Sequence, residues 1–170
     1  ISNVADLSSL RAPRNVFRET LRLYPPGPMM VRQNARPETF RDRPVRAGAQ
    51  VVLSPWHLHR HTRLWDNPDG FDPARWETEA GRATARDAYL PFSAGPRVCT
   101  SAGFAMTEGI VLLSLIMRAY RLDTVHDSEP IPLAHRTVRP RAGIWLKFGP
   151  GHLPSSPHWH QRRALPYSRR

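Results

Sequence analysis

Cys99 is the single cysteine in this chain of 170 residues, and its setting decides what chemistry it can perform. An isolated cysteine is usually a small buried hydrophobe. Cys99, however, lies where an extended loop enters a predicted helix, so unpaired backbone N–H groups and the positive end of the helix dipole point at its sulfur. Both features favour the thiolate over the thiol. Zinc and iron–sulfur sites need several ligands, which one cysteine does not supply.

The residues before Cys99 are suited to shape and protect a ligand loop. Gly95 allows a tight turn, Arg97 offers a fixed cation to a carboxylate, and Phe92 is expected to pack over the sulfur and exclude water. One thiolate is sufficient as the axial ligand of a haem iron, where it pushes electron density onto the metal and favours O–O cleavage. Haem-thiolate chemistry is therefore the chemistry that this segment supports.

Charged residues far upstream form a second group of candidate functional residues. Glu19 and Arg22 stand three apart in a predicted helix, so they share one face and can pair. Exposed pairs of this kind contribute only about 0.3–0.5 kcal/mol and are common. Arg75 lies in a turn between Phe71 and Trp76. It is either a surface arginine of a packed loop or a group that reaches back to the helix pair and locks the loop by charge-assisted hydrogen bonds.

The elements that must position these residues are short, because 18 prolines interrupt the chain. Apolar spacing predicts a first helix over 10–24 and a long helix over 101–120. The other expected elements are strands at 29–31 and 50–54, a polar loop over 66–88, an extended segment over 89–99, and a closing hairpin over 136–148 with 144–146 in its second strand. The predicted fold class is α+β, mainly helical.

The composition, with 40% hydrophobic residues, is sufficient for one domain with its own core. Residues 150–170 are expected to form a basic, disordered tail. No apolar stretch reaches the roughly 20 residues of a membrane span, and the longest, 110–117, is expected to be a buried helix segment. The chain begins without a secretory signal or an initiating Met, as an internal or truncated piece would.

The formal net charge of +11 is carried by arginines and one lysine, Lys147. A basic surface can face nucleic acid, anionic lipid or an acidic protein. The arginines are scattered through apolar segments, without zinc-finger spacing, an RNA-recognition sequence or a basic helix, so nucleic-acid binding is not expected. A basic surface near Cys99 would suit an acidic redox partner.

Two groups of histidines are candidate metal ligands. His57, His59 and His61 alternate, so on a strand their imidazoles would share one face. Such histidines are more often polar positions on an ordinary strand or turn, and this second interpretation is favoured. The other group, which would bind metal only adventitiously, lies in the tail and consists of His152, His158 and His160.

Three separate motifs together resemble those of the cytochrome P450 superfamily. One motif resembles the family's haem-binding signature and reads Phe92-x-x-Gly95-x-Arg97-x-Cys99, followed by Phe104-Ala105 and Glu108. Another resembles the Glu-x-x-Arg motif and reads Glu19-Thr-Leu-Arg22, followed by Leu23-Tyr24-Pro25-Pro26. The last resembles the family's third marker and reads Phe71-Asp72-Pro73-Ala74-Arg75-Trp76. Their order is that of the family, so the three are far more specific together than alone. The resemblance covers residues 1–149, which it implies are a partial haem-binding domain of the cytochrome P450 type.

The resemblance implies the C-terminal portion of the cytochrome P450 fold and a haem-thiolate monooxygenase. Such an enzyme binds haem b and inserts one oxygen atom from dioxygen into a small organic substrate, using electrons from a ferredoxin or a flavoprotein reductase. Cys99 would be the axial ligand, and Arg97 and Arg32 would bind haem propionates. The residues that would form a structural triad are Glu19, Arg22 and Arg75. The anchor-free, arginine-rich chain suggests a bacterial cytoplasmic protein.

The chain departs from the family pattern in two ways. Ser101 stands two residues after Cys99, where the family usually has glycine, so the helix is expected to sit slightly away from the haem or to be capped by the hydroxyl. The family's oxygen-activating helix and most substrate-recognition segments would lie upstream, so this chain alone is expected to be inactive. A truncated, non-catalytic product, an oxygen-independent haem-thiolate isomerase and a peroxygenase remain the alternatives to a monooxygenase.

Overall fold

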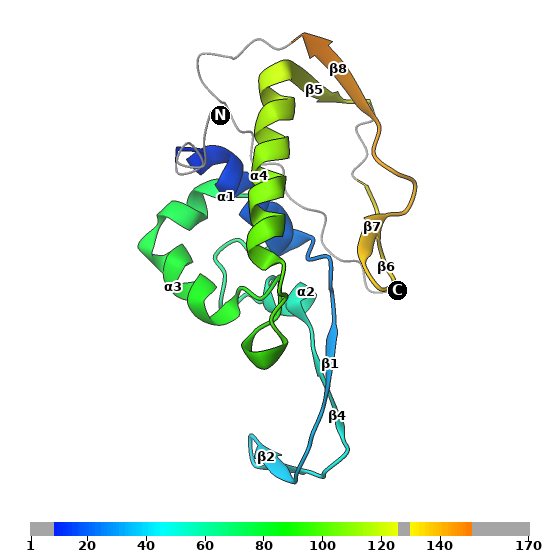
Figure 1. Ribbon diagram of the computed structural model, residues 1–170. Helices are drawn as coiled ribbons and strands as arrows, with labels where there is room; N and C mark the ends of the chain where they lie inside the picture. Colours follow the sequence, from blue (N-terminus) through cyan, green and yellow to red (C-terminus); the bar gives the residue numbers. More distant parts are fainter. Residues whose placement is uncertain (1–8, 126–129, 151–170) are drawn as a thin grey trace.

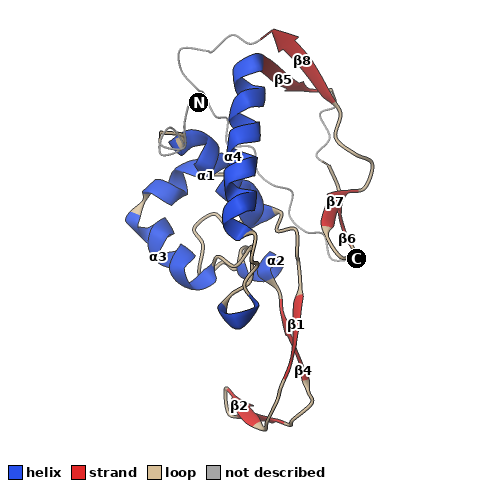
Figure 2. Cartoon of the chain, viewed as in Figure 1, coloured by secondary structure: helices blue, strands red, loops and turns tan. Residues whose placement is uncertain are grey.

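The computed structural model describes residues 9–125 and 130–150 of the chain. Two longer helices, α1 and α4, pack together, with the strands β5 to β8 on one side of them and the ribbon of β1 to β4 projecting from one end (Figures 1 and 2). This arrangement confirms the predicted α+β class with mainly helical character. Within the described ranges each sheet has only two strands, so the sheets position loops and do not form a core of their own.

The first helix, α1 (Arg11–Leu23), confirms the helix predicted over 10–24. Its end follows from the sequence, because Pro25 disfavours a helical conformation at Tyr24 and cannot donate a backbone hydrogen bond. The buried residues of α1 are Asn15, Glu19, Leu21, Arg22 and Leu23. Charged residues on the buried face of a helix require buried partners, so this face predicts a polar network inside the protein.

A long antiparallel ribbon extends from the helical part (Figure 1). Its strands are, in chain order, β1 (Met30–Gln33), β2 (Glu38–Phe40), β3 (Arg43–Val45) and β4 (Gln50–Leu53). β1 pairs with β4, in agreement with the strands predicted near 29–31 and 50–54, and β2 pairs with β3. Arg41 and Asp42 connect the outer strands with φ of 48° and 62°. These left-handed values are the ones that a tight hairpin turn needs.

The prediction of a polar loop over 66–88 is wrong for its second half. After a short helix, α2 (Pro55–Leu58), the chain reaches a 3₁₀ turn, η2 (Pro73–Glu77), and then the helix α3 (Glu79–Ala88). The hydroxyl of Thr78 caps α3 by accepting the Gly81 N–H at 3.0 Å. Apart from alanines, α3 has no apolar residue, so its sequence shows no periodic stripe. It is stabilised by tertiary packing, which buries its last residue beside two tryptophans.

The predicted closing hairpin is also wrong in its pairing. The last strands are β5 (Tyr120–Thr124), β6 (Pro132–Ala134), β7 (Val138–Pro140) and β8 (Leu146–Pro150). β6 pairs with β7 across a short turn, whereas β8 pairs with the distant β5. Ile144 and Trp145, expected inside the second strand, precede β8. A strand pattern in the sequence predicts extended backbone but not the strand with which it pairs. Here the pairing strand lies far away in the sequence.

The helix α4 (Ala102–Ala119) confirms the long helix predicted after Cys99. By length and composition it is apolar enough to cross a membrane. The expectation that 110–117 would be buried is wrong, because only Ile110 of this stretch is buried. Its exposed apolar residues are Leu112, Leu115, Ile116 and Met117. The other face of α4 packs against α1, so we interpret it as a packing helix rather than as a span.

The contact between α1 and α4 depends on Gly109. A Cβ atom at this position would overlap the ring of Phe17, so the two helices approach closely only because Gly109 has no side chain. We expect Gly109→Ala to lower the free energy of unfolding by about 1–3 kcal/mol through overpacking. Urea unfolding followed by circular dichroism measures this loss.

Gly103 in the same helix is the matched control. A Cβ atom there would meet nothing within 4 Å. Gly103→Ala should therefore raise the free energy of unfolding by up to about 1 kcal/mol, because alanine has the higher helix propensity. Equal losses in the two variants would contradict a close approach at Gly109.

Candidate functional site

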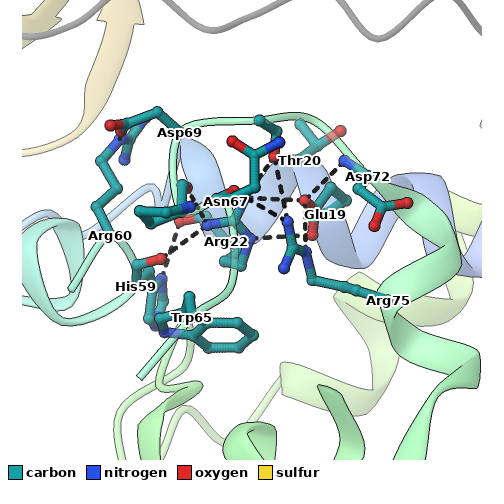
Figure 3. A network of polar contacts seen from close by, with 12 residues as sticks. Glu19, Thr20, Arg22, His59, Arg60, Trp65, Asn67, Asp69, Asp72 and Arg75 are labelled. Atoms are coloured by element: carbon teal, nitrogen blue, oxygen red, sulfur yellow. Dashed lines mark hydrogen bonds and ion pairs between the residues drawn. The ribbon is translucent and has the colours of Figure 1, made fainter. Parts of the chain in front are cut away.

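Glu19, Arg22 and Arg75 meet in a buried network between α1 and η2 (Figure 3). Their side chains are 0%, 0% and 7% exposed. Glu19 Oε1 accepts hydrogen bonds from Arg22 Nη2 at 2.8 Å and from Arg75 Nε at 3.0 Å. Glu19 Oε2 accepts from Arg22 Nε at 3.0 Å, and the Asp72 backbone N–H donates to Oε1 at 3.0 Å. The pair is therefore not the exposed ion pair of the simpler interpretation, and Arg75 reaches back to the helix.

Backbone carbonyls satisfy the remaining guanidinium donors of this network. Arg22 donates to the carbonyls of His59, Pro68 and Gly70. Arg75 donates to those of Asp66, Asn67 and Gly70. The partial negative charges of these oxygens offset the excess positive charge of two arginines on one carboxylate. The network thereby fixes the whole loop before η2 against α1.

His59 extends the network toward the segment that leads to Cys99, a role that the sequence did not indicate. Its ring is buried, with Nδ1 3.0 Å from the Arg22 carbonyl oxygen and Nε2 2.8 Å from the Leu90 backbone nitrogen. Because a backbone N–H only donates, Nε2 must accept the Leu90 N–H. Nδ1 therefore carries the proton, which it donates to the Arg22 carbonyl oxygen. Burial lowers the pKa of His59 to about 4. A neutral His59 therefore bridges the helix α1 and residue 90.

The three alternating histidines do not form a metal cluster. His57 Nδ1 lies 2.8 Å from Ser54 Oγ, and His61 Nδ1 accepts the Arg63 backbone N–H at 3.1 Å. A helical turn at α2 replaces the expected strand, so the side chains diverge. Within residues 9–125 and 130–150, no three His, Cys, Asp or Glu residues are grouped to hold a metal ion. The tail histidines lie outside the described residues, as does the predicted tail over 150–170 apart from its first residue.

The loop before Cys99 is held by its own backbone and by the strand β1. Cys99 N–H donates to the Phe92 carbonyl oxygen at 2.9 Å, which closes the loop on itself. Gly95 has a φ of +66°, so the tight turn expected there does need a glycine. Arg32 Nη2 donates to Ser93 Oγ at 2.9 Å. Arg32 therefore anchors the loop to the ribbon, a contact that the sequence left unpredicted.

The sulfur of Cys99 is exposed on the open side of this loop. The expectation that the sulfur would be shielded from water is wrong, because Cys99 is exposed. Phe92 contributes its backbone carbonyl oxygen, which accepts the Cys99 N–H. Ser101 Oγ lies 3.4 Å from the sulfur. The Ser101 hydroxyl and, to a lesser extent, the Ser101 backbone N–H lower the pKa of the Cys99 thiol. The start of α4 thus stabilises a thiolate that a ligand can reach.

These residues fit a haem better than any other metal group. A haem iron takes one axial ligand from the protein, which matches an exposed cysteine with no clustered second ligand in the described part of the chain. Arg97 is exposed, and none of the described carboxylates pairs with it, so it is available to the propionates that a haem carries. An exposed cysteine and an exposed arginine two residues before it therefore fit a haem, the cysteine as thiolate ligand and the arginine as partner of a propionate.

Comparison with known proteins decides the family. The sequence pattern of the family described as Cytochrome P450 matches residues 2–148, which is most of this chain. The chain belongs to the cytochrome P450 family. Human Cytochrome P450 4V2 is 36% identical over 148 residues, covering 86% of this chain and 28% of that protein. Cyclooctatin synthase of Streptomyces melanosporofaciens is 36% identical over 146 residues, covering 86% of this chain and 30% of that protein.

Solved cytochrome P450 structures share the fold. The crystal structure of the cytochrome P450DA heme domain superposes with a TM-score of 0.80 at 29% identity, covering 89% of this chain and 34% of that one. The 6-coordinated cytochrome P450 from Thermus thermophilus gives a TM-score of 0.69 at 32% identity, covering 87% and 39%. The chain thus spans well under half the length of these P450 relatives. The resemblance predicted from three motifs is confirmed, and the chain belongs to a family of haem-binding monooxygenases.

Proposed function

We propose that this chain holds haem b through Cys99, within a unit formed by residues 1–149. The observation that carries the proposal is the exposed Cys99 sulfur at the start of α4, with Ser101 Oγ 3.4 Å from it. Bound there, a haem would supply the iron at which dioxygen is activated, with the thiolate favouring O–O cleavage.

The other residues of the site have separate tasks in this proposal. Gly95 and Phe92 shape the loop that presents the thiolate. The arginines Arg97 and Arg32 would bind the haem propionates, Arg97 as a free cation and Arg32 while it holds Ser93. The charged triad is proposed as structural support, because it is buried between α1 and the loop at 66–70.

The proposed reaction is the insertion of one oxygen atom from dioxygen into an organic substrate, with electrons from a ferredoxin or flavoprotein reductase. The net charge of +11 supports an acidic redox partner, since opposite charge speeds association. The relatives are matched over only 28–30% of their length, so turnover is proposed for the intact gene product that contains this chain. A bacterial cytoplasmic location remains part of the proposal.

Cys99→Ala tests the proposal directly. The intact gene product loaded with haem, reduced and exposed to carbon monoxide should show the red-shifted absorption band of a thiolate-ligated haem. Cys99→Ala should abolish this band, because no other described residue offers a thiolate. The difference spectrum of the reduced protein before and after carbon monoxide measures it.

Thr100→Ala is the matched control for this experiment. Thr100 is the exposed neighbour of Cys99, and its hydroxyl makes no contact with the sulfur among the described interactions. The control variant should keep the band at full intensity. An unchanged band in Cys99→Ala would overturn the assignment of Cys99 as the ligand.

A further inference from the structure

Ser101 occupies the residue before α4 but does not cap the helix. It has the position of an N-cap, yet its side chain makes no capping hydrogen bond. Of the two expectations for Ser101, capping of the helix by the hydroxyl is therefore wrong. Its Oγ instead lies 3.4 Å from the sulfur of Cys99, and this is the one contact of the hydroxyl among the described residues. Capping would use a lone pair of the hydroxyl oxygen as acceptor, so the O–H of Ser101 is a separate donor that another acceptor can receive.

The direction of this hydrogen bond follows from the state of the sulfur. A ligand thiolate has no proton, so it can only accept, and the Ser101 hydroxyl must donate. The Ser101 backbone N–H also lowers the pKa of the Cys99 thiol, but every residue other than proline would supply that donor. The hydroxyl is thus the part of the contact that depends on the identity of residue 101. An alanine or a glycine at this position would lack it.

Hydrogen bonds to a sulfur ligand change the reduction potential of the metal that the sulfur binds. They withdraw electron density from the sulfur, which weakens its donation to the iron and favours the reduced state. Cys99 and Ser101 are both exposed, and Ser101 Oγ lies 3.4 Å from the sulfur, within reach of a hydrogen bond to it.

We propose that Ser101 is a positioning and tuning residue, whose side-chain hydroxyl donates to the Cys99 thiolate and raises the reduction potential of the iron bound there. The inference rests on the proposed haem ligation by Cys99. The structural triad and Gly95 make no described contact with the sulfur, whereas Ser101 does. Ser101 would therefore influence how readily the bound iron takes up an electron.

The test compares Ser101→Ala and Ser101→Gly with the parent protein, each as the intact gene product loaded with haem. Reduction is followed spectroscopically at controlled electrode potential. At a fixed potential, the ratio of reduced to oxidised haem should fall about five- to tenfold in both variants, the size expected for one lost hydrogen bond. The band of the reduced carbon monoxide complex should move further to the red, since the thiolate donates more strongly.

Ser101→Thr and Thr100→Ala are the controls. Threonine keeps the hydroxyl and should restore the parent ratio, and Thr100→Ala removes a neighbouring hydroxyl that does not reach the sulfur. A role confined to helix stability would change the melting temperature and leave the ratio unchanged.

The outcomes separate the two proposals. Parent values in both Ser101→Ala and Ser101→Gly would overturn the role of the hydroxyl while Cys99 ligation stands. A threonine variant that behaves like alanine would overturn it as well. Absence of the thiolate-type band in the parent protein itself would instead overturn the proposed function.

Discussion

Glu19→Gln is expected to lower the free energy of unfolding by about 3–5 kcal/mol, the range for removing one partner from a buried charge pair. Glutamine has nearly the shape of glutamate, so the loss comes from charge and not from a cavity. Arg22 and Arg75 would remain buried without the carboxylate that binds both. The glutamine NH₂ group would also face guanidinium donors, where nothing accepts its protons.

This loss is large compared with the whole stability of a domain, which is about 5–15 kcal/mol. The carbonyl oxygens that receive Arg22 and Arg75 come from residues 59 and 66–70, so the loop before η2 should loosen together with the network. Urea unfolding followed by circular dichroism measures the loss, and tryptophan fluorescence should follow it, because Trp65 lies under both guanidinium groups.

Glu38→Gln provides the control with the same chemical change. Glu38 pairs with Arg36 at 2.9 Å, but the two side chains are 42% and 83% exposed. Water and salt screen such a pair, so we expect a loss below about 1 kcal/mol. A loss in Glu19→Gln as small as that of the control would contradict the view that the buried triad stabilises the fold.

Acidification is expected to cost about 3 kcal/mol of stability between pH 6.5 and pH 4 through His59 alone. The pKa of His59 is lowered from 6.5 to about 4, first by burial and then by the positive charges of Arg22 and Arg60, while its bond to the Arg22 carbonyl opposes the shift. In this window the unfolded chain binds a proton that the folded chain excludes. The stabilisation is therefore complete above pH 6.5 and is lost as the pH falls toward 4.

The structural consequence should reach the Cys99 loop. A protonated His59 carries a hydrogen on Nε2, so it can no longer accept the Leu90 N–H. The link between α1 and the segment before the loop would then break. Measuring the free energy of unfolding at several pH values, in the parent and in His59→Gln, tests this.

His59→Gln should flatten the part of the pH profile between 4 and 6.5, because glutamine does not titrate there. His57→Gln is the matched control, since His57 is exposed and contacts only Ser54 in the described interactions. The control should keep the parent profile. A steep profile that persists in His59→Gln would show that other groups cause the acid sensitivity.

The helices α1 and α4 and the family could be predicted from sequence because their signals are local. Helical apolar spacing and the prolines at 25–28 define α1, and Cys99 before an apolar stretch defines the start of α4. The three motifs are sufficient to indicate the cytochrome P450 family, since their order along the chain is itself the signal. Side-chain types near Cys99 likewise indicated a thiolate site, although the haem ligation remains a proposal.

Other features depended on contacts between residues far apart in sequence. The sequence alone could not decide whether Glu19 and Arg22 were an exposed pair or a buried one, because both alternatives have the same spacing; burial by the loop at 66–70 decided it. It could not distinguish His59 from two neighbouring histidines, because the partners of His59 are a carbonyl 37 residues away and an amide 31 residues away.

The same reason explains the errors in the fold and at the sulfur. The helix α3 lacks a periodic apolar stripe and is held by tryptophans from other segments, and β8 pairs with β5 across the last part of the chain. The orientation of Ser101 toward Cys99 depends on how the loop enters α4. Sequence by itself thus indicated which cysteine is the candidate ligand and to which family the chain belongs. Only the tertiary structure decided which charges are buried, which histidine is shared between segments, and what touches the sulfur, since burial and partnership arise from long-range packing.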